Sequence, residues 1–236
     1  FGELFEAAAT DPLAREALRN PYSLAPRGER SGVDPGEQRG PRRDALRGEW
    51  TAPSPMAAVN ERVVRRSNAL LGYPWGREFR CTEVVPTGTG VRGAATAGLV
   101  AGGLGAFTAA MSVGPVRSAL RRYVFPDPGE GPTREEAEAG YFRIRVLGRG
   151  TAADGPFTVE ARFGADRDPG YGATARMLGE SAVCLARGDV DSPFDGGVLT
   201  PASGIGLPLA ERLREVGFTA RAGEPGDGDS RRRSKE

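Results

Sequence analysis

The clearest pattern of apolar and polar positions predicts a helix that starts at Ser54 and runs to about Leu70. Ser54 can cap the first-turn amides, and Pro55 suits the first helical position. The Gly72 and Pro74 pair supplies a stop. At 100° per residue, one face of this helix is an apolar stripe that also contains two polar residues. The stripe consists of Met56, Val59, Val63 and Leu70, with Asn60 and Ser67 among them.

Two interpretations of the polar pair remain open. An unpaired buried amide or hydroxyl costs about 1–3 kcal/mol, so Asn60 and Ser67 must have partners. In the first interpretation, this is a core helix whose polar side chains bond to a neighbouring loop. In the second, the helix places Asn60, Ser67 and the guanidinium of Arg66 at the edge of a pocket, with Arg65 on the opposite side.

Alternating segments predict three strands. Arg77–Val85 alternates with Phe79 and Cys81 on one side. Tyr141–Arg149 and Phe157–Gly164 also alternate, and a short polar turn joins them. We therefore expect an antiparallel pair that lies beside Arg77–Val85.

Two further helices are predicted after these strands. Asp168 and Pro169 start a helix from about Gly170 to Ala186, and Leu207–Val216 is amphipathic. Together these elements predict an α+β fold, with an antiparallel or mixed sheet flanked by helices. The expected inner face of the first helix consists of Ala173, Thr174, Met177, Ser181 and Cys184.

Composition along the chain predicts three parts. Residues 1–53 form a wrap of two short amphipathic helices and a loop rich in Pro, Gly and Arg, with Trp50 as its large anchor. Residues 54–219 form the α+β domain. Residues 220–236 are rich in Gly, Asp, Ser and Arg and predict a disordered tail.

The segment Gly93–Val113 has no charged residue over 21 positions. Its length suits a bilayer span, yet a helix packed on the protein or dipping into lipid fits it as well. The stripe of Val100, Leu104, Phe107 and Met111 indicates that one side is buried. An arginine cluster follows the segment. We therefore expect a cytoplasmic protein, with peripheral contact to the plasma membrane or to a synthase through Gly93–Tyr123 as one option.

Gly88, Gly90 and Gly93 match the spacing G-x-G-x-x-G of dinucleotide-binding turns. Three observations argue against that function. The preceding strand alternates, no acidic residue occurs between Val84 and Asp127 to hold a ribose, and no second strand follows promptly. A lone match of this kind is weak, so we expect no cofactor-binding residues in this chain.

Composition excludes several classes of site. The chain has no histidine, which excludes a Ser-His-Asp or Cys-His catalytic unit and a His-ligated metal. Two cysteines are too few for a Cys-rich metal site, so none is expected, and both predict buried thiols in a reducing cytoplasm. The net charge of +1 gives no basic excess for nucleic acid. The chain begins at Phe1 without a methionine or a signal segment, and we expect it to be part of a longer protein.

Three blocks carry a resemblance to a known family. The blocks PMAAVNERVVRRSNALLGYPWGREFRCTEVV, DPGYGATARMLGESAVCLA and GGVLTPA…GLPLAERLREVGF resemble the C-terminal part of the saccharopine-dehydrogenase-like oxidoreductases. The trans-acting enoyl reductase branch is the nearest, over about residues 1–218. The resemblance implies an NAD(P)-dependent reduction of an acyl or polyketide enoyl thioester on a carrier protein, in the synthesis of complex lipids.

The resemblance also implies a missing part. The family carries NAD(P) on an N-terminal Rossmann domain, which this sequence lacks, and its C-terminal α+β domain covers the substrate. We therefore expect the chain alone to be inactive. The alternative is a non-catalytic module that docks on a membrane or a synthase.

The implied reaction assigns candidate residues. Reduction of an enoyl thioester requires hydride, a proton and donors for the enolate oxygen. Without histidine, Tyr73 and Tyr171 are the candidate proton donors, and Tyr171 begins a helix, whose dipole favours a developing anion. Asn60, Arg66 and Ser67 are the candidate substrate contacts. Packing and solvated charge are the alternative roles for these residues.

Overall fold

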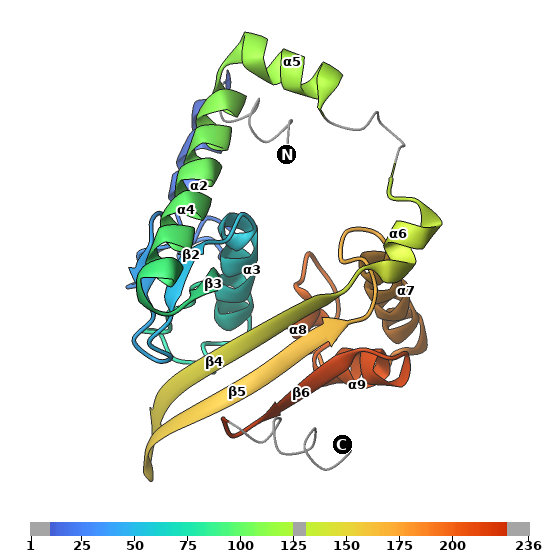
Figure 1. The fold of residues 1–236 in the computed structure, drawn as a ribbon. Helices are drawn as coiled ribbons and strands as arrows, with labels where there is room; N and C mark the ends of the chain where they lie inside the picture. Colours follow the sequence, from blue (N-terminus) through green and yellow to red (C-terminus); the bar gives the residue numbers. More distant parts are fainter. Residues whose placement is uncertain (1–9, 125–130, 226–236) are drawn as a thin grey trace, which may run out of the picture. The chain divides into compact units, whose positions relative to one another are not determined.

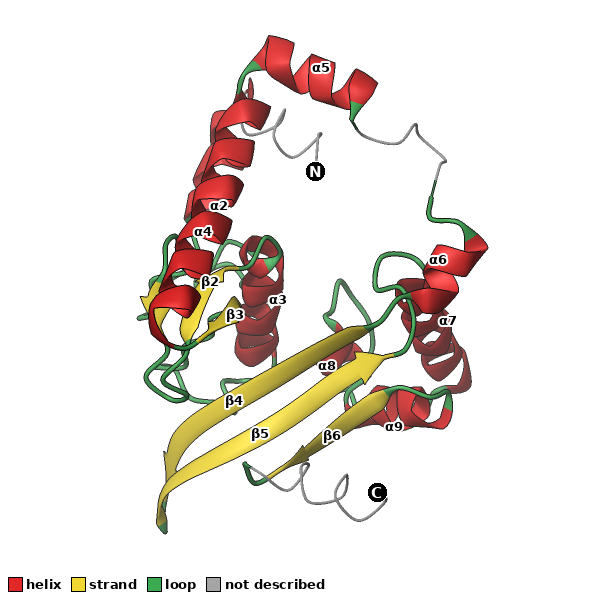
Figure 2. Ribbon diagram, in the orientation of Figure 1, coloured by secondary structure: helices red, strands yellow, loops and turns green. Residues whose placement is uncertain are grey.

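The computed structural model describes residues 10–124 and 131–225 (Figure 1). Contacts divide the chain into two compact units, Phe1–Asp127 and Pro128–Glu236. Each unit contains one three-stranded antiparallel sheet with helices, which confirms the α+β class (Figure 2). The first amphipathic helix and most of the tail expected from the sequence lie outside the described residues.

Unit 1 contains the sheet β1-β2-β3 and four described helices. β2 is the central strand, and Thr51, Ala52 and Pro53 are buried in it. The sequence pattern predicts a loop over this segment, because a four-residue strand is too short to show a pattern. The elements are α2 (Pro12–Arg19), β1 (Arg42–Arg43), β2 (Trp50–Pro53), α3 (Ala57–Leu70), β3 (Val84–Gly88), α4 (Gly90–Ser112) and α5 (Gly114–Tyr123).

The strand predicted over Arg77–Val85 is wrong for most of its length. β3 begins only at Val84 and pairs with β2, not with strands of unit 2. Residues 77–83 have no regular structure, because buried carboxylates replace a neighbouring strand as hydrogen-bond acceptors. The backbone N–H of Cys81 donates to Asp34 Oδ2 at 2.8 Å, and that of Glu83 donates to Glu61 Oε1 at 2.8 Å.

Helix α3 exists as predicted but buries a different face. Met56 and Val59 are 39% and 41% exposed, whereas Glu61 and Arg65 are 1% and 3% exposed. The helix begins at Ala57 rather than directly after Ser54. The prediction that the apolar stripe faces the core is therefore wrong for the N-terminal half of the helix. The chain instead buries a charged face.

On the buried charged face of α3, Arg65 and Glu61 form a cluster with Asp34 of the preceding loop. Arg65 Nε donates to Asp34 Oδ2 at 2.9 Å, and Arg65 Nη2 donates to Glu61 Oε2 at 2.8 Å and to the Cys81 carbonyl at 3.0 Å. Asp34 Oδ1 accepts the Gly36 N–H at 3.0 Å. The buried charges are thus paired and hydrogen-bonded, as burial of a charge requires.

Three arginines of α3 also hold the irregular chain that precedes them. They donate charge-assisted hydrogen bonds to backbone carbonyls, which are stronger than neutral ones. These bonds fix the segment from Leu18 to Leu24 against the helix. The bonds run from Arg62 to the carbonyls of Leu18 and Asn20, from Arg65 to that of Pro21 and from Arg66 to that of Leu24.

Helix α4 packs on the sheet through Gly93 and Ala97, which are buried. The expected buried stripe is confirmed at Met111, while Val100 and Phe107 remain 36% and 41% exposed. By length and composition α4 is the one described helix that could cross a membrane, a test that core helices also pass, and 11% of its most apolar window is buried. Its opposite face is exposed and consists of Val91, Ala95, Leu99, Gly102 and Ala106.

Unit 2 contains the sheet β4-β5-β6, in which the hairpin of β4 (Phe142–Ala152) and β5 (Gly155–Ala165) confirms the predicted antiparallel pair. The third strand is β6 (Thr219–Gly223), which pairs with Glu160–Gly164. Strand structure thus continues beyond residue 220, where the sequence predicted a tail. No strand in the described part of the chain pairs with the outer edge of β4.

The core of unit 2 lies between this sheet and its helices. The rings of Phe142, Phe163 and Phe218 lie 5.6–6.4 Å apart, beside the buried Ala173 and Leu213. The segment 196–200 forms bends, with no strand in it. The helices of this unit are α6 (Arg134–Ala139), α7 (Gly172–Arg187), α8 (Pro201–Gly204) and α9 (Leu207–Glu215).

The cap of α7 is confirmed. Asp168 Oδ2 accepts the backbone N–H of Tyr171 at 2.6 Å and that of Gly172 at 3.3 Å. On the predicted inner face, Ala173 and Cys184 are buried, whereas Thr174 is exposed. The Asp168 side chain therefore sets where α7 begins.

We predict that Arg65→Met destabilises unit 1 by about 3–5 kcal/mol, because two buried carboxylates lose their cation. Urea unfolding followed by circular dichroism measures the change. The matched control is Arg80→Met, at an exposed arginine, which should cost less than about 0.5 kcal/mol. Equal effects of the two substitutions would show that the buried pairing does not hold the unit together.

We predict that Asp168→Ala lowers the Tm at pH 7 and that this loss shrinks in acid. The N–H groups of Tyr171, Gly170 and Gly172 lower the pKa of the Asp168 carboxyl. A carboxyl group whose pKa is lower in the folded protein than in the unfolded chain stabilises the folded state. This stabilisation is complete at pH values above the unfolded pKa, near 3.8, and is lost as the pH falls through the folded pKa. Thermal scans at several pH values test this.

Two variants serve as controls for this capping prediction. Asp168→Asn keeps a capping oxygen but does not titrate, so its smaller loss should not depend on pH. Asp195→Ala removes an exposed carboxylate elsewhere in unit 2 and should leave the Tm unchanged. A pH-independent loss in Asp168→Ala would contradict the assignment of a charged cap.

Candidate functional site

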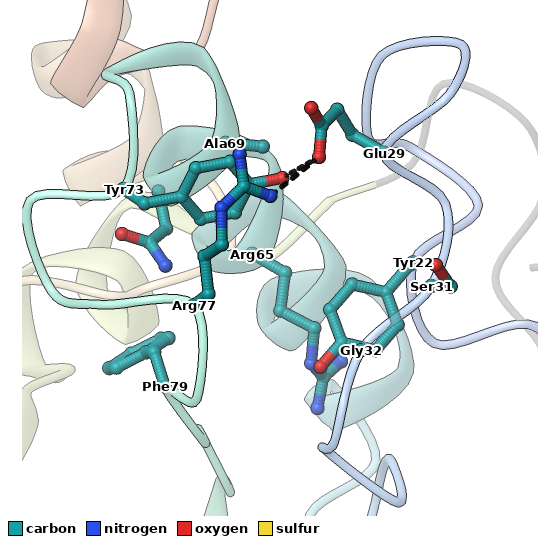
Figure 3. A pocket seen from close by; sticks show the side chains of 10 residues that line it. Tyr22, Glu29, Ser31, Gly32, Arg65, Ala69, Tyr73, Arg77 and Phe79 are labelled. Carbon is teal, nitrogen blue, oxygen red and sulfur yellow. Dashed lines mark hydrogen bonds and ion pairs between the residues drawn. The ribbon is translucent and has the colours of Figure 1, made fainter.

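A pocket of about 170 Å³ lies in unit 1 between α3, the turn that follows it and the preceding loop (Figure 3). It is smaller than pockets for drug-sized ligands, which span about 300–1,000 Å³. It suits the reactive end of a molecule rather than a whole long ligand. Its lining consists of Tyr22, Glu29, Ser31, Gly32, Arg65, Asn68, Ala69, Tyr73, Arg77 and Phe79.

Tyr73, one of the two predicted proton donors, lies in this pocket. Its φ is +66°, and it is the one non-glycine residue with positive φ in the described ranges. Such a backbone costs energy and needs support from its surroundings. Asn68 gives that support: its carbonyl accepts the Tyr73 N–H at 2.7 Å, and its side chain bonds Gly76 and Trp75 at 2.9 and 3.1 Å.

The Tyr73 hydroxyl donates a hydrogen bond to Glu29 Oε2 (Figure 3). Arg77 completes the group, since its Nη1 lies 3.1 Å from the same oxygen and its guanidinium stacks 4.1 Å from the centre of the Tyr73 ring. The site therefore joins a phenol, a carboxylate and a guanidinium from two segments that lie far apart in the sequence. Glu29 belongs to the loop that α3 holds.

The electrostatics of this group fix its protonation at neutral pH. Hydrogen bonds from Tyr73 and Arg77 lower the pKa of the Glu29 carboxyl. Burial and the hydrogen bond to Glu29 raise the pKa of the Tyr73 phenol. Glu29 is thus a carboxylate and Tyr73 a neutral phenol, which is the form that a proton donor requires.

The three predicted substrate contacts lie outside the lining of this pocket. Asn60 Nδ2 donates to Glu83 Oε2 at 2.7 Å. Ser67 is buried and its hydroxyl donates to the Val63 carbonyl at 2.8 Å, within the same helix. Arg66 bonds the Leu24 carbonyl. All three have partners within the protein: Asn60 and Arg66 bond neighbouring segments, whereas the bond of Ser67 stays within the helix.

Tyr171, the other predicted donor, lies in unit 2 at the start of α7 and is 61% exposed. Its ring lies beside Gly131, where an added Cβ would be 3.6 Å from Tyr171 Cζ. Tyr73 and Tyr171 thus belong to different units, and the pocket of unit 1 contains one of them. No titratable neighbour is hydrogen-bonded to the Tyr171 hydroxyl among the contacts described.

The sequence patterns do not identify Glu29, Tyr22 and Arg77 as site residues. Tyr22 and Glu29 lie in a loop without periodicity, and Arg77 was assigned to a strand. The sequence does place a glutamate and two aromatic residues within segments rich in Gly and Pro. Such segments form loops, and loops often carry binding or catalytic residues. That signal does not identify which distant turn the loop meets.

The glycines at 88, 90 and 93 form a strand–turn–helix between β3 and α4. Gly88 and Gly90 have φ of +93° and +65°, and a Cβ at Gly93 would lie 2.4 Å from the Gly88 carbonyl oxygen. Each glycine therefore has a structural role. The sheet here is antiparallel, unlike the parallel sheet of a dinucleotide-binding fold, so these residues do not fit NAD(P).

Metal and thiol chemistry have little support in the described ranges. Those ranges contain no group of three His, Cys, Asp or Glu side chains that could hold a metal ion. Cys184 is buried, and burial raises the pKa of the Cys81 thiol to about 11. Cys81 is therefore not a reactive thiolate at neutral pH.

Comparison with known proteins gives a consistent group of relatives. A Mycobacterium tuberculosis protein with the provisional name trans-acting enoyl reductase is 39% identical over 92% of this chain and 53% of its own length. Trans-acting enoyl reductases of Mycobacterium ulcerans and Mycobacterium bovis are 34% and 35% identical, over 94% and 92% of this chain and 54% and 53% of their own lengths.

The sequence matches no protein-family model, and no solved structure is significantly similar to it. The relatives themselves are nearly twice as long as the part that matches. This chain is thus a homologue of proteins named trans-acting enoyl reductase over 92% of its length, and it spans about half the length of those relatives.

Proposed function

We propose that this chain is the substrate-binding part of an NAD(P)-dependent enoyl reductase that acts on an acyl or polyketide thioester bound to a carrier protein. The observation that carries the proposal is similarity to proteins named trans-acting enoyl reductase over 92% of the chain. The saccharopine-dehydrogenase-like fold family belongs to the same proposal. It rests on the three sequence blocks given above.

The cofactor is assigned to another part of the protein. The turn at Gly88–Gly93 does not fit a dinucleotide, and the chain spans about half the length of its relatives. We therefore assign NAD(P) to a Rossmann domain in the half of the relatives outside the match. Bound there, the cofactor would supply hydride, and this chain alone would be inactive.

Tyr73 is the proposed proton donor of this chain. Reduction of a conjugated thioester adds hydride at one carbon and a proton at the next. Tyr73 can give its phenol proton to that second carbon and recover one from water. The hydrogen bond to Glu29 fixes the position of the phenol oxygen. Arg77 supplies positive charge beside the ring, which would stabilise a developing enolate. The pocket volume suits the thioester and its double bond.

The experiment that tests the function uses a chimera in which this chain replaces the matching part of the Mycobacterium tuberculosis relative. We expect oxidation of NADPH that depends on an enoyl N-acetylcysteamine thioester, with the saturated thioester as product. A folded chimera that fails to reduce the thioester while the unaltered relative succeeds would overturn the proposal. In calorimetry at millimolar NADPH or NADH, the chain alone should show no binding. Saturable binding would overturn the cofactor assignment.

We predict that Tyr73→Phe lowers kcat of the chimera about 100-fold or more and changes KM only a few-fold, because it removes the proton and not the aromatic ring. Tyr141→Phe is the matched control, at an exposed tyrosine of unit 2, and should retain full activity. Steady-state kinetics with the thioester measure both. A large loss in Tyr171→Phe with none in Tyr73→Phe would move the donor to unit 2.

The pH profile separates catalysis from packing in this prediction. Burial is the largest cause of the raised pKa of the Tyr73 phenol, and the hydrogen bond to Glu29 is the second. The substitution Glu29→Gln should therefore lower the pKa of Tyr73. Activity requires the neutral phenol, so the alkaline limb of kcat should move to lower pH in this variant. An unchanged limb, with only reduced stability, would leave Glu29 a purely structural residue.

A further inference from the structure

The exposed side of α4 has an unusual surface for a helix in water. No charged residue occurs from Gly93 to Val113, and Val91 and Leu99 are 86% and 78% exposed. An exposed apolar patch of this kind usually marks an interaction surface. At 1.5 Å per residue, the 23 residues of α4 extend over about 34 Å.

Helix α5 continues this surface with a basic amphipathic pattern. Val116 and Tyr123, which are 41% and 77% exposed, lie on one side of the helix with Leu120. Arg122 lies over the Tyr123 ring, 5.6 Å from its centre, and Arg117 Nη1 donates to the Met111 carbonyl at 3.2 Å. Basic amphipathic helices with aromatic and aliphatic residues on the apolar face are typical of helices that lie in a membrane interface.

The charge distribution selects the partner. Residues 84–126 contain four arginines, at positions 92, 117, 121 and 122, and no Asp or Glu. The whole chain has a net charge of +1, so this segment carries +4 and the remainder −3. Guanidinium groups thus stand before and after an uncharged stretch. This arrangement matches anionic headgroups that border an acyl layer.

We propose that α4 and α5 form a peripheral binding site for an anionic lipid surface. The apolar side chains of Val91, Leu99 and Val116 would enter the boundary between headgroups and acyl chains, while the exposed Arg92 and Arg122 bind lipid phosphates. The helices lie on the surface and do not cross it, since the buried Gly93 and Ala97 keep α4 on its sheet. This site is independent of the proposed reaction.

Sedimentation with lipid vesicles tests the proposal on the intact chain. We expect binding to vesicles of phosphatidylcholine and phosphatidylglycerol, little binding to phosphatidylcholine alone, and weaker binding as salt rises. The double variant R92E/R122E should bind more than about tenfold more weakly. The matched control is R27E/R80E, which makes the same charge change at exposed arginines of the same unit and should retain binding.

Insertion is measured with a fluorescent label on an introduced cysteine. Cys184 is buried and the Cys81 thiol has a pKa of about 11, so Leu99→Cys should label selectively at neutral pH. An environment-sensitive nitrobenzoxadiazole label there should shift to the blue on anionic vesicles. The control Leu178→Cys, on α7 of unit 2 with 70% exposure, should show no shift.

Three outcomes would overturn the proposal. Equal binding by R92E/R122E and R27E/R80E would show that the arginines of α4 and α5 do not recognise the lipid. If the chain sediments with vesicles but the label at position 99 shows no blue shift, the lipid contact lies elsewhere on the protein. Self-association without vesicle binding, seen by light scattering, would identify a second copy of the chain as the partner of α4.

Discussion

The buried pairing of Arg65 with Asp34 and Glu61 is the interaction on which unit 1 depends. A loop of more than twenty residues without periodic apolar positions has little hydrophobic free energy with which to fold. Here the loop contributes Asp34 and several carbonyls, and α3 contributes the guanidinium groups that bind them. Because these charged groups are buried, all of their hydrogen bonds must form at the same time. This requirement restricts the loop to one defined path.

The pocket follows from that path. Glu29 lies between the segments that α3 holds, and it meets Tyr73 across the turn that ends the helix. The positive φ of Tyr73 turns the chain at the end of α3, and the Tyr73 side chain reaches Glu29 in the loop. A helical backbone at this position would direct the side chain elsewhere. The same helix thus determines both sides of the pocket.

Much of the fold could be predicted from the sequence, because its longer elements carry strong periodic patterns. Helices α3, α4, α7 and α9 and the hairpin of β4 and β5 all fall where the pattern places them. The face of α3 could not be predicted by the usual rule that apolar residues face inward. Arg65 and Glu61 are buried because of partners that lie 16 to 31 residues away, and periodicity contains no information about such partners.

The candidate site shows the same limit. Tyr73 was recognised as a possible donor from residue type, whereas Glu29 and Arg77 become its neighbours only through tertiary structure. The alternation over Arg77–Val85 predicted a strand, yet the backbone there bonds buried carboxylates instead. Alternation alone thus does not distinguish a strand from an irregular segment whose amides bond side chains.

The outer edge of β4, with which no strand of the described residues pairs, has a consequence for how the chain behaves at high concentration. An eleven-residue edge strand offers backbone N–H and C=O groups as a template on which a strand of another molecule can add. Arg143, Arg145 and Arg149 recur along this strand, with glycines at 148 and 150. Arg143 and Arg145 form ion pairs with Asp166 and Glu160, and the glycines weaken regular pairing with a second such edge. The hairpin thus carries its own protection against edge-to-edge aggregation.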